Sequence, residues 1–200
     1  MERQNRLYLV RHGQIDGYEN FPIYGHTDVE MTETGKLQMQ KVAERLSMTD
    51  IKAVYSSDLK RAKVGAQYVA GHHDIPICSL PELREMHFGD WEGMTLEQIR
   101  QLFPQELKKR QEDLVNFRIP GKGESIAQFD QRIMAALNDI RSHHSGHDIA
   151  LVVHGGVNRV ILCNALGLDL RNMFRINQDY GCLNIIDYLS DSTVVRLMNG

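Results

Sequence analysis

The sequence lacks the features that would direct a chain into a membrane or an oxidising compartment. No apolar run approaches the roughly 20 residues that a membrane span requires, and the polar N-terminus contains no apolar signal region. The three cysteines, Cys78, Cys163 and Cys182, are far apart and odd in number. This pattern favours free thiols in a cytoplasmic protein over a disulfide framework or a zinc site.

An excess of charge of one sign is also missing. The formal net charge is −3, so no overall basic field indicates binding to nucleic acid or to an anionic membrane. Any anion-binding site in this chain must therefore be a local cluster of cations.

Motifs for metal and nucleotide binding are absent as well. The chain contains no Gly-rich Walker loop and no aspartate-rich metal cage. The histidine tract at 143–147 has no accompanying cysteine or carboxylate spacing, so we interpret it as a solvated helix end. We expect neither a metal nor a cofactor. No repeat or linker-like composition divides the chain, which predicts a single domain over residues 1–200.

Short apolar runs alternate along the chain with segments of helical periodicity. This alternation predicts one α/β domain with a mainly parallel sheet. The residues Thr32, Thr95 and Ser125 stand where helix N-caps are expected, and Gly167 is the expected end of an apolar helix over 157–166. The expected strands cover residues 7–10, 51–55, 75–78, 149–153, 182–188 and 193–198.

Two of the apolar runs end in similar polar sequences. The first ends in Arg11-His12-Gly13 and the second in His154-Gly155-Gly156. Ligands of open α/β sheets bind beyond the carboxyl ends of the strands, so parallel central strands would bring both histidines together there. A helix beginning near Gly155 would direct backbone N–H groups to the same place, and Arg61 would approach from the helix after the second strand. The cluster predicts a phosphoryl site.

A proton donor for such a site is available in the acidic loop over 80–93, which contains several carboxylates, among them Glu85. Each residue alone has a simpler interpretation. Arg61 could be a surface arginine, His154 a buried core histidine and Glu85 one solvated charge among several. It is their combination that favours an enzyme handling phosphate.

Four segments, in this order, carry a family resemblance: Leu9–Gly13, Ser57–Ala62, Leu83–Gly93 and Val153–Gly156. Together they resemble the histidine phosphatase superfamily, also called phosphoglycerate mutase-like. The resemblance implies a three-layer α/β/α fold and a phosphohistidine intermediate. It implies His12 as the nucleophile, Glu85 as the proton donor, and His154, Arg11 and Arg61 as phosphate ligands. Gly155, at the expected helix N-terminus, is a further expected substrate contact.

Within this family, the acidic loop and residues 174–182 are similar to α-ribazole-5′-phosphate phosphatases of cobalamin biosynthesis. We therefore expect a metal-independent phosphatase acting on a small phosphorylated metabolite. The alternatives are a sugar-phosphate or phosphoglycerate phosphatase or mutase, and a non-catalytic phosphate-binding module. The resemblance implies that cofactor-dependent mutases of the family carry a longer insertion after the acid glutamate. Here only about forty residues separate Glu85 from Ser125, which favours hydrolysis over the mutase reaction. The sequence does not indicate an oligomeric state.

The chain departs from the family pattern at three positions. Gln14 stands where glutamate is usual, and Gly65 where threonine is common. Tyr18 stands where an asparagine commonly touches the phosphate, so one expected donor is missing.

For His12 to attack phosphorus, its other ring nitrogen must be held by an acceptor, and we expect a backbone carbonyl.

Overall fold

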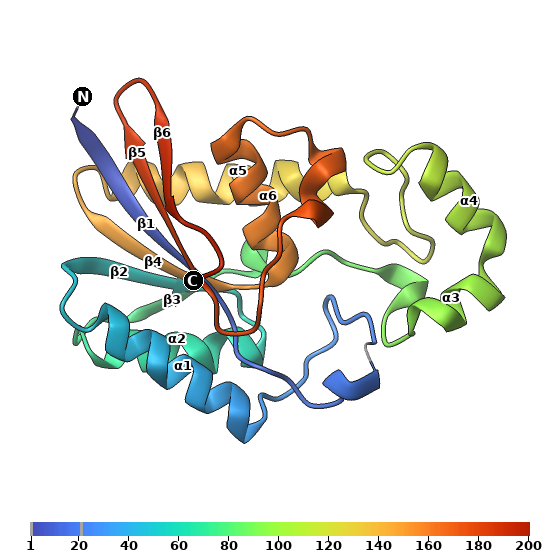
Figure 1. Ribbon diagram of the computed structural model, residues 1–200, viewed down its shortest axis with the longest axis horizontal. Coiled ribbons are helices and arrows are strands. Elements are labelled where there is room, and N and C mark those ends of the chain that lie inside the picture. The colour runs from blue at the N-terminus through green and yellow to red at the C-terminus, as the bar shows by residue number, and fades with distance from the viewer. Residues whose placement is uncertain (1, 21) are drawn as a thin grey trace.

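The computed structural model describes residues 2–20 and 22–200, which form a six-stranded mixed sheet (Figure 1). The strand order is β3-β2-β4-β1-β5-β6. The first four of these run parallel, and β5 and β6 run antiparallel to their neighbours. The strands are β1 Arg3–Arg11, β2 Ile51–Ser56, β3 Ile77–Ser79, β4 Asp148–Val153, β5 Leu183–Leu189 and β6 Thr193–Leu197.

Helices cover both faces of the sheet, as expected for three layers. In Figure 1, α1 and α2 lie on one side and α5 and α6 on the other, while α3 and α4 lie away from the sheet. Thr32, Thr95 and Ser125 cap α1, α3 and α5 as predicted. The helices are α1 Glu33–Leu46, α2 Lys60–Gly71, α3 Leu96–Leu102, α4 Pro104–Glu112, α5 Ile126–His143 and α6 Gly155–Leu166.

The central strands read as continuous apolar runs because both of their faces are buried. In β1, Leu7 and Leu9 enter the core under α5 and α6, whereas Tyr8 and Val10 enter the core under α1 and α2. In β4, alternate residues divide in the same way. This confirms the predicted α/β/α architecture with a mainly parallel sheet.

The observed boundaries differ from the predicted ones by two or more residues at three elements. Strand β1 begins at Arg3 instead of Leu7, because its polar N-terminal half pairs with β5. Strand β3 covers only Ile77–Ser79. The apolar pattern places the start of helix α6 at Val157, but the helix begins at Gly155. The two glycines of its first turn carry no apolar side chain and therefore lie outside that pattern.

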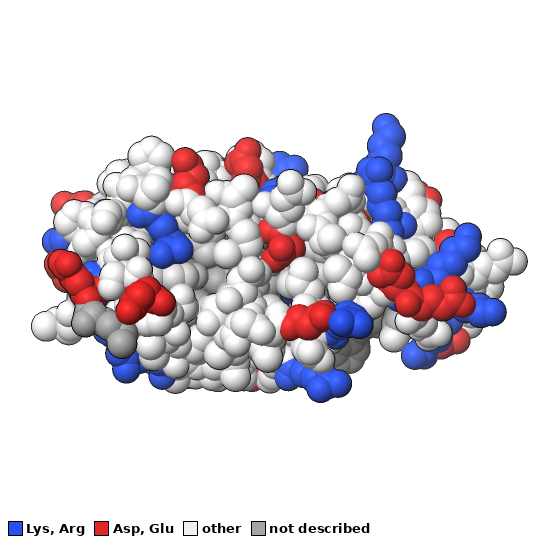
Figure 2. All heavy atoms as spheres, turned by 90° about the horizontal axis from the view of Figure 1, so that it is seen from above, with Lys and Arg blue, Asp and Glu red and all other residues white. Residues whose placement is uncertain are grey.

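Two further properties of the structure, its helix hydrophobicity and its surface charge, concern binding to membranes and nucleic acids. No helix within residues 2–20 and 22–200 is long and apolar enough to cross a membrane. On the face seen in Figure 2, acidic and basic side chains are interspersed, and neither sign covers a broad area. That face therefore offers no extended basic surface to a polyanion.

Candidate active site

The predicted histidines meet at the carboxyl edge of the sheet. Strands β1 and β4 pair in parallel with Arg11 opposite Val153, and the backbone N–H of His12 donates to the carbonyl of Val153 at 2.9 Å. The next residue of each chain segment is therefore a histidine at the same level. The ring centroids of His12 and His154 are 5.2 Å apart in an edge-on arrangement, and both side chains are buried.

The ring of His12 is held in one orientation. Its Nδ1 lies 2.8 Å from the carbonyl oxygen of Gly13. Because a carbonyl can only accept a hydrogen bond, Nδ1 carries the proton and Nε2 presents a lone pair. This is the backbone acceptor that the sequence led us to expect. Burial, together with the charges of Arg61 and Arg11, holds the pKa of His12 well below its ordinary value of 6.5, so the ring is neutral near pH 7.

His154 is oriented by Ser57. The Nε2 atom of His154 lies 2.8 Å from the Ser57 hydroxyl, and that hydroxyl oxygen already accepts the backbone N–H of Leu59 at 3.1 Å. The hydroxyl hydrogen can donate to Nε2, and in that arrangement the imidazole proton is on Nδ1. Nδ1 is buried and forms no hydrogen bond with any described residue. In this tautomer, the site contains a buried N–H donor that has no acceptor among the described residues.

Two guanidinium groups complete the cluster, and backbone carbonyls hold both. Arg61, at the start of α2, donates to the carbonyls of Thr27 at 2.8 Å and Gly25 at 2.7 Å. Arg11 donates to the carbonyl of Gln178 at 2.6 Å, and its guanidinium carbon lies 3.9 Å from the ring centre of Tyr180. The Nε of Arg11 is buried without a partner among the described residues. Fixed cations with free donors form a site for a dianion.

The carboxyl group of Glu85 is bound at the N-terminus of α6. One oxygen accepts the N–H of Met86 and the other the N–H of Gly156, each at 2.8 Å. A Cβ atom at Gly156 would lie 2.2 Å from Oε1 of Glu85, so only glycine allows this approach. His154 is the N-cap of the same helix. The predicted proton donor therefore lies beside the histidine cluster.

Gly155 lies between two guanidinium groups. A Cβ atom there would be 3.3 Å from Nε of Arg11 and 3.2 Å from Nη1 of Arg159. Sequence reasoning missed Arg159, although its position one helical turn after Gly155 directs its side chain back toward the N-terminus of α6. Its Nε donates to the carbonyl of Ile176 at 2.9 Å, and its terminal nitrogens bind no described residue.

Sequence reasoning also missed Glu92, which organises the loop that holds Arg61. Its carboxylate accepts the backbone N–H groups of Gly25, His26 and Thr27 and the hydroxyl of Thr27, at 2.7 to 3.1 Å. Burial raises the pKa of Glu92, but these hydrogen bonds outweigh burial and lower it below its ordinary value. No spacing in the sequence indicates this contact, since it joins residues more than sixty positions apart.

A cavity of about 260 Å³ adjoins the cluster at Arg11. Its other lining residues are Ile15, Tyr18, Pro22, Tyr24 and Tyr180. Tyr18, the departure from the family pattern, thus lines the same cavity as Arg11. Three phenol rings make this cavity suited to a flat, partly apolar group.

The cluster can bind and polarise a phosphoryl group with protein side chains alone. Among the residues that the structure describes, no three His, Cys, Asp or Glu side chains gather as metal ligands would. The fold and this arrangement define a class: residues 7–200 match the histidine phosphatase superfamily, branch 1, and the chain belongs to that family. It is a phosphatase of the histidine type.

Two similar proteins have names that give different substrates. The chain is 29% identical over 203 residues to the adenosylcobalamin/α-ribazole phosphatase of Escherichia coli K12, covering 97% of this chain and 95% of the relative. It is 26% identical over 194 residues to phosphoserine phosphatase 1 of Hydrogenobacter thermophilus, covering 97% and 92%. The crystal structure of a putative α-ribazole-5′-P phosphatase from Escherichia coli superposes with a TM-score of 0.90 at 27% identity, covering 98% and 97%.

Proposed function

We propose that this phosphatase hydrolyses a phosphomonoester through a phosphohistidine on His12, with α-ribazole 5′-phosphate as its substrate. The observation that carries the catalytic part is the meeting of an unprotonated Nε2 on His12 with two buried nitrogens that have no partner among the described residues, Nε of Arg11 and Nδ1 of His154. A dianion bound by those donors would present its phosphorus to the His12 lone pair.

In the first step, Nε2 of His12 attacks phosphorus in line, and the bond from phosphorus to the leaving oxygen breaks. Glu85, in its protonated form, gives its proton to that oxygen, so the alcohol leaves neutral. In the second step, Glu85 takes a proton from water as the water oxygen attacks phosphorus. The Nε2–phosphorus bond breaks, phosphate leaves, and both residues return to their starting states.

The charges of the phosphoryl oxygens are balanced by the chain itself. Arg11, Arg61 and His154 donate to the equatorial oxygens, each such bond contributing on the order of 1.5–3 kcal/mol. These donors are fixed before the substrate arrives, so little reorganisation accompanies the transition state. No metal ion is needed in this scheme, and we expect full activity in the presence of a chelator.

The substrate assignment has support from the cavity as well as from the relatives. A leaving group attached to phosphorus must lie within a few bonds of Arg11, and the cavity lined by Tyr18, Tyr24 and Tyr180 begins at that residue. Phenol rings pack against flat aromatic rings with about 0.5–1.5 kcal/mol beyond area burial. α-Ribazole carries such a ring one sugar away from its phosphate.

A second candidate is favoured by Arg159. Its free terminal nitrogens and its position beside Gly155 suit a carboxylate on the leaving group, as in phosphoserine or phosphoglycerate. Burial lowers the pKa of Arg159 while the Glu85 carboxylate raises it, so Glu85 is already close to this guanidinium. An acidic substrate would gain one further charge-assisted bond there.

Comparison of kcat/KM for α-ribazole 5′-phosphate and phosphoserine, with EDTA present, tests both candidates. We expect the ribazole to be preferred at least tenfold. Tyr18→Ala should lower its kcat/KM about tenfold and leave phosphoserine within about twofold, whereas Arg159→Gln should affect phosphoserine more. The reverse preference would replace the first candidate with the second. Absence of activity on every phosphomonoester, including p-nitrophenyl phosphate, would indicate a phosphate-binding module.

We also propose a cytoplasmic location and no nucleic-acid partner. Cys78, Cys163 and Cys182 are free thiols, as is usual in a reducing compartment. The net charge of −3 gives no general attraction to a polyanion.

A further inference from the structure

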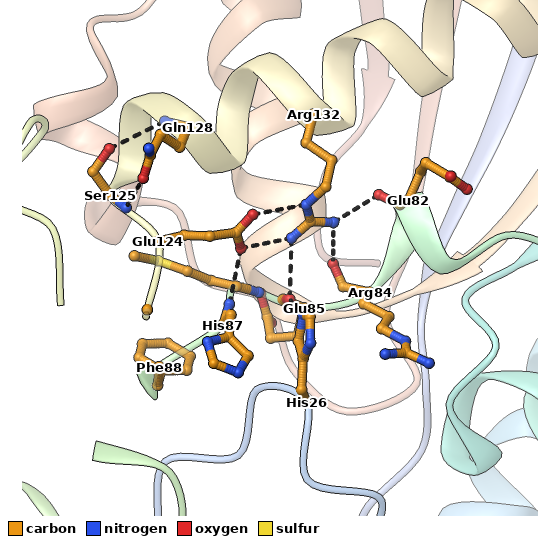
Figure 3. A network of polar contacts seen from close by, with 12 residues as sticks. His26, Glu82, Arg84, Glu85, His87, Phe88, Glu124, Ser125, Gln128 and Arg132 are labelled. Atoms are coloured by element: carbon orange, nitrogen blue, oxygen red, sulfur yellow. Dashed lines mark hydrogen bonds and ion pairs between the residues drawn. The ribbon is translucent and has the colours of Figure 1, made fainter. Parts of the chain in front are cut away.

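The segment that contains Glu85 has little regular structure to hold it. Residues 84–88 lie between the short 3₁₀ helices Pro81–Leu83 and Gly89–Trp91. Such a segment depends on side chains from elsewhere to satisfy its backbone groups. Figure 3 shows that one side chain, Arg132 on α5, reaches several carbonyls in and beside this segment.

Arg132 binds three carbonyl groups around the acid. Its Nη1 donates to the carbonyls of Glu82 at 2.7 Å and Arg84 at 3.0 Å, and its Nη2 donates to that of Glu85 at 3.3 Å. The planar fork of a guanidinium can serve several acceptors in fixed directions. The backbone on the N-terminal side of the Glu85 side chain is thereby tied to helix α5.

Glu124 fixes Arg132 and also holds the other side of the acid. Its two oxygens accept Nε and Nη2 of Arg132 at 2.8 and 2.7 Å. One of these oxygens accepts the N–H of His87 at 2.9 Å, and the N–H of Glu124 donates to the carbonyl of His87 at 2.8 Å. Burial raises the pKa of Glu124, but its bonds to Arg132 and His87 lower it overall, so Glu124 stays ionised.

His26 closes the arrangement from the opposite side (Figure 3). Its Nε2 lies 3.0 Å from the carbonyl oxygen of Glu85, and its ring packs edge-on against that of His87 with centroids 4.6 Å apart. The carbonyl of Glu85 therefore receives two donors, Arg132 and His26. The backbone at Glu85 is thus held from two sides, and its carboxyl group lies at the N-terminus of α6.

We propose that Arg132, held by Glu124, is a positioning residue for proton transfer by Glu85. The inference rests on the proposed role of Glu85 as proton donor. By fixing the backbone of residues 82–87, the Arg132–Glu124 pair keeps the carboxyl group at the N-terminus of α6, where the leaving oxygen must receive its proton. Without the pair the phosphoryl site stays intact, but the proton donor is misplaced.

This role predicts a dependence on the leaving group that general loss of structure would not produce. A p-nitrophenolate leaves readily without a proton, whereas the alkoxide of an alkyl phosphate must be protonated as it leaves. The parameter kcat/KM reports the first transfer to His12 and excludes the later hydrolysis of phosphohistidine. Comparing p-nitrophenyl phosphate with β-glycerol phosphate therefore isolates proton donation.

For Arg132→Gln, we expect kcat/KM to fall about tenfold to hundredfold on β-glycerol phosphate and at most about threefold on p-nitrophenyl phosphate. Arg132→Lys keeps the charge without the fork and should lie between this variant and the wild type. Circular dichroism and thermal unfolding would establish folding. If Arg132→Gln does not fold, Glu124→Gln is the second variant, because it removes one of the bonds to Arg132 or His87. It should change kcat/KM for the two substrates in the same direction as Arg132→Gln, but by a smaller factor.

Arg84→Gln is the matched control. Arg84 lies in the same segment and forms a two-bond ion pair with Asp58 at 2.6 and 2.5 Å, but its side chain does not bind the backbone around Glu85. We expect this variant to change both substrates by the same factor. An equal change in Arg132→Gln would overturn the positioning role.

The failure of the inference can be distinguished from failure of the proposed function. Suppose that Glu85→Gln selectively loses activity on β-glycerol phosphate while Arg132→Gln does not. Glu85 is then the proton donor, and Arg132 does not position it. If Glu85→Gln retains both activities, the donor has been assigned wrongly and the inference fails with it.

Discussion

The two sides of the active site are held in different ways. Arg11, His12 and His154 continue from strands β1 and β4, whose backbones are hydrogen-bonded along their length. Glu85 lies in an irregular segment between two short 3₁₀ helices, and it depends on Arg132 and Glu124 from another part of the chain. The nucleophile side is thus positioned by the sheet and the acid side by side chains. Changes on the first side should stop phosphoryl transfer, and changes on the second should affect proton transfer selectively.

The largest expected effect is at the nucleophile. His12→Asn removes the lone pair that Nε2 presents while retaining a polar side chain of similar reach. We expect kcat/KM to fall about 10⁴-fold or more on every substrate. Rapid-quench detection of a phosphorylated enzyme, present in the wild type and absent in the variant, checks the assignment. Phosphorylation of the variant at an unchanged rate would place the nucleophile elsewhere.

Glu85→Gln tests the difference between the two sides of the active site. It should lower activity on some substrates more than on others, whereas His12→Asn should lower activity on all of them. The amide can still accept the N–H of Gly156 but cannot donate an acidic proton. We expect a loss of about 10²–10⁴-fold in kcat/KM for an alkyl phosphate and a much smaller loss for p-nitrophenyl phosphate. A series of leaving groups of rising pKa measures this. An equal loss across the series would contradict the division between the two sides.

Glu92→Gln tests a contact that bridges the two sides. The amide nitrogen would face backbone N–H groups of residues 25–27 that now donate to a carboxylate oxygen, so the loop holding Arg61 would shift. We expect kcat/KM to fall about tenfold to hundredfold on all substrates, which corresponds to one charge-assisted bond. Inhibition by inorganic phosphate should weaken in parallel. Unchanged phosphate affinity would show that Arg61 does not depend on Glu92.

The smallest effect concerns pH. Burial and the neighbouring Arg61 and Arg11 lower the pKa of His12 below 6.5, so the neutral nucleophile persists at pH 6.5 and is lost only as the pH falls through the lowered pKa. An NMR titration of the His12 ring in the free enzyme should have its midpoint below 6.5. The unfolded chain binds this proton nearer 6.5, so the free energy of unfolding should fall as the pH drops below that value. A midpoint at or above 6.5 would contradict this environment.

The fold and the nucleophile side could be predicted because their signals are local. Doubly buried strands read as short apolar runs, and the polar residues that follow them mark the edge where ligands bind. The predicted meeting of His12 with His154 followed from the parallel pairing of two strands. The helix start expected near Gly155 agrees with α6, although the apolar pattern alone begins two residues later. Gly155 and Gly156 are poor helix formers that serve here to bring the backbone close to Arg11 and Glu85.

The acid side could be predicted only as far as Glu85 itself. Its supports come from residues separated widely along the chain: Arg132 binds the Glu85 carbonyl across 47 positions. A single arginine on a helix has no sequence signal that distinguishes this role from a solvated one. Arg159 had a partial signal, because its spacing from Gly155 places both on one side of α6. The tyrosine-lined cavity required the loop conformation, which no periodicity specifies.

The hydrogen bonds from Arg61 to backbone carbonyls also limit how substrate specificity can change in this enzyme. Tyr18 and Tyr24 shortly precede in the sequence the carbonyls of Gly25 and Thr27 that orient this arginine. Exchanging the tyrosines can retune which alcohol is accepted, but inserting or deleting residues near Gly25 would disturb catalysis at the same time. Redesign for new substrates should therefore vary side chains before position 25 and keep the loop length fixed.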